Sequence, residues 1–358
     1  MENATSPMDN VTLSSEFMPN LEELYGHFLT LNTLFTLIIT FPTMYIVNAK
    51  TLRHYANCIL NIIIFNFALN IYSSTFYRIV PLYPSFCFKN NGILRYFAAN
   101  DTAAYYSILF NFSCYFNITA AVVVLQVYRF LQIVCKKSIE NITRAIGYSC
   151  VGIVHFFATV IAILVCQHTR APPAKYQEVY KDNEYFLKEL KDPTVICFEK
   201  ENIFFLNVSV IGVVGVVVTG STILQFISIR HLKRNRETLS AQQYEHQRRL
   251  SFHLLAIALV PICFGGAPFE IIFISLMFHN SYMQAVAVIS SCVALLHLNI
   301  FCIFVLALFK SYRFATKALL YKMMQMNPTV TVSTSSIVLE ERTDSMHRPR
   351  TGNRINVI

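Results

Sequence analysis

The sequence predicts an all-α membrane protein, folded as a bundle of seven transmembrane helices with its N-terminus outside the cell. The first observation is composition: 54% of the 358 residues are hydrophobic and only 14% are charged, whereas ordinary soluble domains carry about 25% charged residues. The second is a mean hydropathy of +0.46. The third is that the apolar residues fall into seven runs, each near the ~20 residues that a helix needs to cross a bilayer. A soluble fold could not bury this much apolar surface, so the chain is expected to span a membrane.

The seven runs give the order of the elements. Because backbone N–H and C=O groups find no water in hydrocarbon, each run is expected to be a helix. The expected helices span residues 27–47, 55–76, 104–128, 144–166, 203–229, 251–278 and 283–309. They form one transmembrane domain at 27–309, preceded by an extracellular acidic tail at 1–26 and followed by a juxtamembrane helix at 310–326 and a disordered cytoplasmic tail at 327–358.

The distribution of Lys and Arg sets the expected orientation. With the N-terminus outside, the cytoplasmic segments and the helix ends beside them hold 20 of the 29 lysines and arginines, and such an excess marks the cytoplasmic side. The outer tail then carries two N-glycosylation patterns, at Asn3 and Asn10. The cations form short clusters between apolar runs rather than one basic face, so nucleic acid is not expected as a partner.

Arg129 ends the third apolar run, within Tyr128-Arg129-Phe130. In the predicted orientation it lies at the cytoplasmic end of helix three, where water begins. One interpretation is an interfacial anchor whose side chain reaches back to the membrane surface. The other is a functional arginine that contacts an intracellular partner or locks the resting bundle, and the sequence leaves both open.

Further basic residues surround the same mouth of the expected bundle. They are Lys136, Lys137, Lys233, Arg234, Arg236, Arg248, Arg249 and Arg313. Positive-inside topology and attraction to anionic lipid, about 1 kcal/mol per cation, explain such charges without a further function. The functional interpretation is that these residues and Arg129 form a cationic rim around a groove for a partner helix.

Helix six contains the strongest signal for a moving part. Pro261, Gly265, Gly266 and Pro268 lie within eight residues of one another. A proline removes one intrahelical hydrogen bond and clashes with the carbonyl four residues back, so a kink or hinge is expected here. A hinge would let contacts in the outer half swing the inner end of the helix, but a static kink fits the pattern equally well.

Glu270 is the only Asp or Glu well inside an expected span, and its place along helix six puts it near the outer leaflet. An ionisable residue in a membrane is a functional candidate by default, although an interfacial residue paired with a nearby cation is the alternative. Aromatic residues at similar depth suit the apolar wall of a small-ligand pocket, and they suit ordinary helix packing as well. The expected ligand-binding residues are Tyr105, Tyr106, Phe110, Glu270 and Phe273.

The ten cysteines include no CxxC pair, so the sequence predicts neither a metal site nor a cofactor. Cys87 and Cys197 both lie outside in the predicted topology, where oxidising conditions favour a disulfide. That bond would tie the loop before helix three to the second external loop. Cys166, at the outer end of helix four, is the competing partner.

Four stretches carry a resemblance to a known family. They are Pro81-Leu-Tyr-Pro84 followed by Gly92-Ile-Leu, Val127-Tyr128-Arg129-Phe130, Thr238-Leu-Ser-Ala-Gln-Gln with Pro261 beyond it, and Tyr312-Arg313. In order and spacing they resemble the nematode serpentine chemoreceptors of the Str superfamily, nearest the Srh and Sri branches, over roughly residues 40–320. The chain departs from the family at Lys50-Thr51-Leu52, where Thr-Pro is usual, and at His297-Leu-Asn-Ile-Phe, where helix seven usually has a proline.

The resemblance implies a G-protein-coupled chemosensory receptor in the plasma membrane, within the cilia of sensory neurons. It would bind a small environmental or pheromone-like ligand in the outer half of the bundle and signal through a heterotrimeric G protein. A Ser/Thr cluster at 329–336 suits phosphorylation and an arrestin-like partner. A ligand-gated channel or a transporter of seven-helix type is the alternative, although a transporter should show buried charges along a path. The chain has no HExxH, GxSxG or P-loop pattern, so no enzyme is expected.

Overall fold

The structure is a computed structural model of the chain. It describes residues 17–50, 53–82, 87–97, 99–135, 144–173, 176, 190–199, 202–275 and 283–323. The chain divides into two units, Met1–Arg313 and Phe314–Ile358, and the membrane-length helices of the described residues belong to the first. The expected glycosylation sites Asn3 and Asn10, the rim residues Lys136 and Lys137, and the tail at 327–358 lie outside the described residues.

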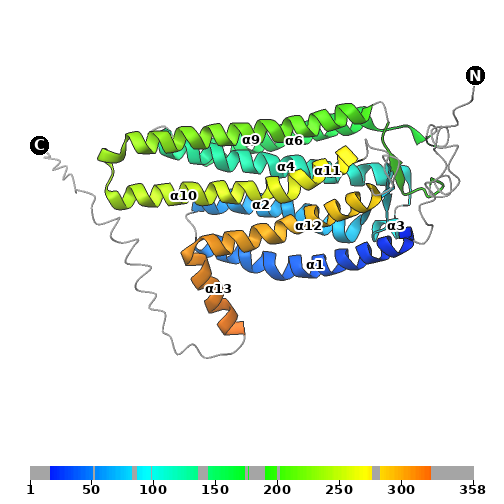
Figure 1. The fold of residues 1–358 in the computed structure, drawn as a ribbon, viewed down its shortest axis with the longest axis horizontal. Helices are drawn as coiled ribbons and strands as arrows, with labels where there is room; N and C mark the ends of the chain where they lie inside the picture. The colour runs from blue at the N-terminus through cyan, green and yellow to red at the C-terminus, as the bar shows by residue number, and fades with distance from the viewer. Residues whose placement is uncertain are drawn as a thin grey trace, which may run out of the picture. The chain divides into compact units, whose positions relative to one another are not determined.

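Seven helices of the described chain are long and apolar enough to cross a membrane, which confirms the predicted bundle of seven transmembrane helices, whereas the outside N-terminus stays a prediction. They run side by side in Figure 1. In chain order the elements are α1 (Phe17–Lys50), α2 (Arg53–Ile71) continued by the π-helix η1 (Tyr72–Phe76), α4 (Asp101–Val134), α6 (Arg144–Thr169), α9 (Ile203–Arg234), α10 (Ala241–Val260) continued by the π-helix η4 (Pro261–Gly266) and by α11 (Ala267–Ser275), and α12 (Met283–Leu308). The second candidate span, Tyr55–Phe76, has the predicted bounds, whereas most of the others run several residues beyond them.

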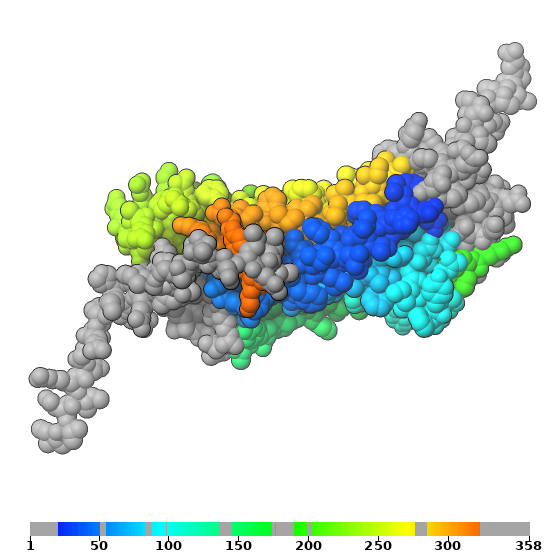
Figure 2. Space-filling view, turned by 90° about the horizontal axis from the view of Figure 1, so that it is seen from below, coloured from blue at the N-terminus to red at the C-terminus, as the bar shows by residue number. Residues whose placement is uncertain are grey.

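The third transmembrane helix, α4, is the centre of the bundle. It packs against α2, α6 and α9, and 56% of its most apolar stretch is buried, against 17% for α6 and for α9. Helix α1 packs against α2 and α12, and the space-filling view shows α1 in blue beside α12 in orange (Figure 2). The buried side chains of α4 therefore make up much of the interior of the bundle, where they contact α2, α6 and α9.

A small sheet closes one end of the bundle, which we call the disulfide end. Strands β1 (Ile79–Leu82), β2 (Cys87–Asn90) and β3 (Val195–Cys197) pair antiparallel in that order, with Cys87 opposite Cys197. A disulfide joins these two cysteines, which confirms the predicted pairing, and the competing Cys166 is free and buried.

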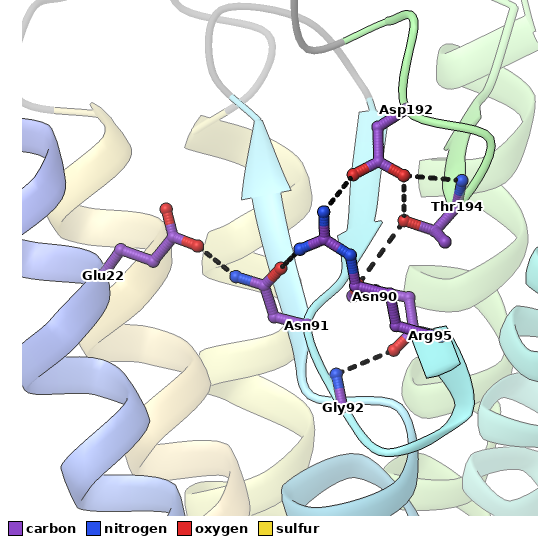
Figure 3. Close-up of polar contacts among 7 residues, drawn as sticks. All are labelled: Glu22, Asn90, Asn91, Gly92, Arg95, Asp192 and Thr194. Carbon is purple, nitrogen blue, oxygen red and sulfur yellow. Dashed lines mark hydrogen bonds and ion pairs between the residues drawn. The ribbon is translucent and has the colours of Figure 1, made fainter. Parts of the chain in front are cut away.

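Polar contacts fasten this sheet to its surroundings (Figure 3). Asn91 donates a hydrogen bond to Glu22 of α1, and Arg95, in the short helix α3 (Leu94–Phe97), pairs with Asp192 at 3.0 Å. Thr194 donates to Asp192 from both its backbone N–H and its hydroxyl. The sheet is thus held from α1 and from the segment before β3.

The opposite end, which we call the arginine end, holds Arg129. There α9 passes through the short 3-10 helix η3 (Arg236–Thr238) into α10, whose first turn is capped by the Ser240 side chain accepting from the backbone N–H of Gln243 at 3.2 Å. A further helix, α13 (Lys310–Met323), begins where the sequence predicts a juxtamembrane helix.

Candidate functional site

A cavity of about 120 Å³ lies inside the bundle. Its wall is built mainly by one face of α4, by η4 and α11, and by α12, and the sheet contributes Ile79, Pro81 and Phe88. On α4 the lining residues recur every three or four positions, which is the spacing of one helical face. They are Ile108, Asn111, Phe112, Tyr115, Ile118, Thr119 and Val122.

Of the five expected ligand-binding residues, only Phe273 lines this cavity. Tyr106 and Phe110 are wrong as wall residues, because their side chains are 62% and 40% exposed on the outside of the bundle. Tyr105 is buried but lies under the Arg170 guanidinium, 4.5 Å from its ring centre, rather than at the cavity. The length of the apolar run predicts how deep these aromatic residues lie in the bundle, but it does not predict the rotation of α4 about its own axis.

Glu270 does not line the cavity either. Both of its carboxyl oxygens are buried and have no hydrogen-bond partner among the described residues. The structure therefore does not show the alternative interpretation either, in which Glu270 is an interfacial residue paired with a nearby cation. The carboxyl group lies near Tyr115. Tyr115 in turn stacks on Phe269 at 4.5 Å, and both rings line the cavity.

The predicted irregularity in helix six is present as a π-helix. In η4 the backbone winds wider than an α-helix from Pro261 to Gly266, and such π-bulges occur frequently at functional sites. Gly265 faces His297 of α12, because a Cβ atom at this glycine would lie 3.4 Å from the imidazole ring. Pro268 follows in the first turn of α11. Whether this segment bends in use stays a prediction.

Arg129 is fully buried, so it is not an interfacial anchor and not part of an exposed rim. It donates to the Tyr55 hydroxyl at 2.8 Å and to Gln132 at 2.9 Å, which ties it to α2 and to its own helix. It also donates to the backbone carbonyl of Gln247 at 2.8 Å and to the Ser251 hydroxyl at 3.1 Å, both in α10. All of these partners are neutral, and together they satisfy a guanidinium that burial would otherwise penalise strongly.

Two glutamine side chains also donate hydrogen bonds to α10. Gln126 of α4 donates to the carbonyl of Leu254 at 3.4 Å, and Gln225 of α9 donates to the carbonyl of Ser251 at 3.0 Å. We call Gln126, Arg129 and Gln225 the α10 clamp. It fixes the half of helix six that lies between η4 and the arginine end.

The other expected coupling residues are exposed at the arginine end. They are Lys233, Arg234, Arg236, Arg248, Arg249 and Arg313. Arg249 pairs with Glu245 at 3.1 Å, and Arg236 lies 5.5 Å from the ring centre of Tyr244. Arg129 is not among these exposed cations because it is buried, and whether they form a rim for a partner stays a prediction. In the described part of the chain, no group of three or more His, Cys, Asp or Glu side chains could hold a metal ion.

Comparison with known families agrees with this arrangement. Residues 20–322 match the serpentine type 7TM GPCR chemoreceptor family Srh. The chain belongs to this family. It is therefore a seven-transmembrane chemosensory receptor of GPCR type and a multi-pass membrane protein. No curated protein matched the chain.

Sequence reasoning missed several residues of this Srh receptor that the structure brings together. The clamp partners Tyr55 and Ser251 gave no signal, because single hydroxyl residues are common near helix ends. Gln126 and Gln225 did give one, since an amide inside an apolar span needs a partner in a neighbouring helix. Tyr115 was passed over in favour of Tyr105, Tyr106 and Phe110, which lie about one to three turns away along α4.

Proposed function

We propose that this Srh receptor binds a small-molecule ligand in the central cavity and signals through a heterotrimeric G protein at the arginine end. One observation carries the proposal. The cavity touches η4 at Pro261, Gly265 and Gly266, and the α10 clamp holds the same continuous helix farther along. A ligand and a G protein would thus act on the two ends of one element.

The chemistry of the clamp suits a switch. A hydrogen bond to a charged group contributes about 1.5–3 kcal/mol, and one between neutral groups about 1 kcal/mol. Because every acceptor is neutral, releasing α10 leaves no buried carboxylate without its partner, and the freed guanidinium would lie next to the rim. A ligand shifts this equilibrium only if it binds the released state more tightly than the held state. Contact with η4 gives it a means to do so.

The orientation belongs to the proposal. We place the N-terminus and the disulfide end outside, because a disulfide forms in oxidising compartments and because the sequence segments expected on the opposite side contain 20 of the 29 lysines and arginines. The cavity would then be reached from outside, and the rim would face the G protein. The family favours the plasma membrane of sensory cilia, and the Ser/Thr cluster at 329–336 favours an arrestin-like partner. An epitope tag ahead of Leu24 should bind antibody on intact cells, and a tag reachable only after permeabilisation would contradict this orientation.

Signalling is tested with variants of the clamp. Gln126→Leu and Gln225→Leu remove donors to α10, while the α10 carbonyls keep their helical hydrogen bonds. We expect ligand-independent G-protein signalling, measured as cyclic nucleotide or calcium in expressing cells, to rise about five-fold or more for the double variant. The matched control is Gln167→Leu, which changes an exposed glutamine of α6.

Arg129→Ala provides the complementary test. We expect it to abolish signalling in the double variant at unchanged surface amounts, since the rim alone would lack the central cation. Unaltered signalling from both sets of variants would contradict the proposed coupling. Ion currents that persist after the G protein is blocked would favour the channel alternative.

A further inference from the structure

The short helix α3 carries exposed apolar residues at the disulfide end. Tyr96 and Phe97 are 85% and 82% exposed, and Ile93, directly before α3, is 43% exposed. Large apolar groups are unfavourable in water, and contiguous exposed patches of them mark surfaces that contact a membrane or a partner. We call Ile93, Tyr96 and Phe97 the α3 tip, and the question is what covers it.

The segment that carries the tip is fastened to the protein by polar contacts. The backbone N–H of Ile93 donates to the carbonyl of Thr75 in η1 at 3.2 Å. On the other side Arg95 pairs with Asp192, as Figure 3 shows. The tip is therefore presented by a segment that is held in place from two directions.

The contact with Thr75 fixes the depth of the tip. Thr75 lies in the last turn of the second candidate span, Tyr55–Phe76, whose 22 residues make a helix of about 33 Å. Because the hydrocarbon core of a bilayer is about 30 Å thick, this turn lies where the acyl chains meet the headgroups. Tyr96 and Phe97 follow Ile93 within about one turn, so the tip lies near the same boundary.

The two helices to which α3 is joined carry an exposed aromatic surface of their own. Tyr106 and Phe110 of α4 are 62% and 40% exposed, and Phe76 of η1 is 41% exposed. The ring of Tyr72 joins the two helices, with its centre 4.4 Å from that of Phe110 and 6.1 Å from that of Phe76. These residues belong to membrane-length helices, so the surface faces lipid. The α3 tip adjoins it, because α3 is hydrogen-bonded to η1 and precedes α4 in the chain.

We propose that the α3 tip is a membrane anchor, which inserts between the acyl chains and the headgroups of the lipid leaflet at the disulfide end. Tyrosine is enriched at this boundary, since its ring is apolar and its hydroxyl binds water or a headgroup. Through Arg95 and the contact with η1, the anchor holds the sheet at the membrane surface. The inference depends neither on the proposed function nor on which end of the bundle faces outside.

Tryptophan fluorescence tests the proposal, because the chain contains no tryptophan. Tyr96→Trp and Phe97→Trp each place a single indole at the tip of the full chain, reconstituted in lipid nanodiscs. Phospholipids with brominated acyl chains quench an indole in the bilayer, whereas iodide quenches one in water. We expect brominated lipid to remove most of the emission of both variants and iodide to remove little of it.

Two reference variants bracket this result. Val216→Trp occupies a position of α9 that is 73% exposed, and bromine deep in the acyl chains should quench it best. Gln242→Trp occupies an exposed position in the first turn of α10, and only iodide should quench it. For the tip we expect bromine near the headgroups to quench more than deep bromine.

Two outcomes would overturn the proposal. Tip tryptophans that respond to iodide but not to brominated lipid would show that the tip lies in water. Tip tryptophans shielded from both quenchers would show that a protein surface covers it, such as a second copy of the chain. Both variants should fold normally, because the replaced side chains are exposed, and an unchanged thermal midpoint checks this.

Removing the anchor gives a second, independent measurement. Tyr96→Ser with Phe97→Ser should lower the thermal midpoint in nanodiscs, because the tip then loses its apolar contact with lipid. A tip that lies in water would instead leave the midpoint unchanged or raise it, since exposed substitutions of this kind have little effect on the fold. That outcome would contradict the anchor.

Discussion

The two ends of the bundle are held by different kinds of interaction. At the disulfide end a covalent bond and the backbone hydrogen bonds of the sheet join the β1–β2 hairpin to β3. An ion pair joins Arg95 to Asp192 before β3, and a side-chain hydrogen bond joins Asn91 to Glu22 of α1. At the arginine end the described polar contacts of α10 with α4 and α9 are side-chain hydrogen bonds to neutral groups, beside the packing of buried apolar side chains. The first end can change only by breaking strong contacts, and the second can open at the cost of a few hydrogen bonds. From this difference we expect the movable part of this receptor to lie at the arginine end.

Removing the disulfide should have the largest effect on stability. The bond joins cysteines 110 residues apart, and in the chain-entropy model a closed loop of that length contributes about 4–5 kcal/mol. We expect Cys87→Ser with Cys197→Ser to lower the thermal midpoint strongly and to reduce the amount at the cell surface. Cys150→Ser, at an exposed free cysteine, is the control. An unchanged midpoint in the double variant would remove the basis for calling this end the fixed one.

Gly92→Ala should have the next largest effect, again at the disulfide end. A Cβ atom at this position would lie 2.2 Å from the backbone oxygen of Phe76, so the hairpin must move away from η1. We expect a loss of about 1–3 kcal/mol or more in the free energy of unfolding, as for overpacked cores. Gly212→Ala is the matched control, because its added methyl group meets no atom within 4 Å and a helical Gly→Ala change gains roughly 0.5–1 kcal/mol. Equal midpoints for the two variants would show that the hairpin is not pinned there.

Much of this fold was predictable from the sequence. Hydrophobic length alone locates the helices, because the bilayer thickness is fixed, and the span at 55–76 has the bounds found in the structure. The pairing of Cys87 with Cys197 followed from the topology. The sheet was not predictable, since its strands of three or four residues carry too little pattern, and since α4 and α6 lie between β2 and β3 in the chain.

The site was predictable only in part. Pro261, Gly265 and Gly266 were singled out correctly as an irregular segment, because proline and glycine act through the backbone wherever the helix points. Tyr106 and Phe110 were wrong because wall residues depend on helix rotation, which packing decides. The burial of Arg129 could not be foreseen, since its partners Tyr55 and Ser251 lie 74 and 122 residues away in the chain.

The comparison between the ends predicts that stiffening η4 reduces signalling without lowering stability. A Cβ atom at Gly266 would have ordinary contacts, the nearest being the Tyr115 hydroxyl at 3.6 Å. Gly266→Ala should therefore fold normally but resist changes of backbone conformation by about 0.5–1 kcal/mol. We expect ligand-independent signalling of the Gln126→Leu, Gln225→Leu receptor to fall roughly two- to five-fold when this change is added. Unaltered signalling would favour a static kink, and a lowered thermal midpoint would mean that the substitution is not sterically neutral.

The smallest effect concerns the ion pair between Arg95 and Asp192. Partial burial alone would raise the pKa of the Asp192 carboxyl group, but hydrogen bonds from Thr194 and the charges of Arg95 and Lys89 outweigh it and hold the pKa below its ordinary value. Such a carboxylate stabilises the fold fully above its unfolded-state pKa of about 3.9, and the stabilisation is lost as the pH falls through the lower folded-state value. Because the Arg95 side chain is 44% exposed, the contribution should stay below about 1 kcal/mol. Asp192→Asn should therefore lower the thermal midpoint slightly at neutral pH and narrow its difference from the wild type below about pH 4, whereas Glu245→Gln at the arginine end should leave the midpoint unchanged. A difference between wild type and Asp192→Asn that persists or grows in acid would mean that the carboxylate is not what holds Arg95 to the segment before β3.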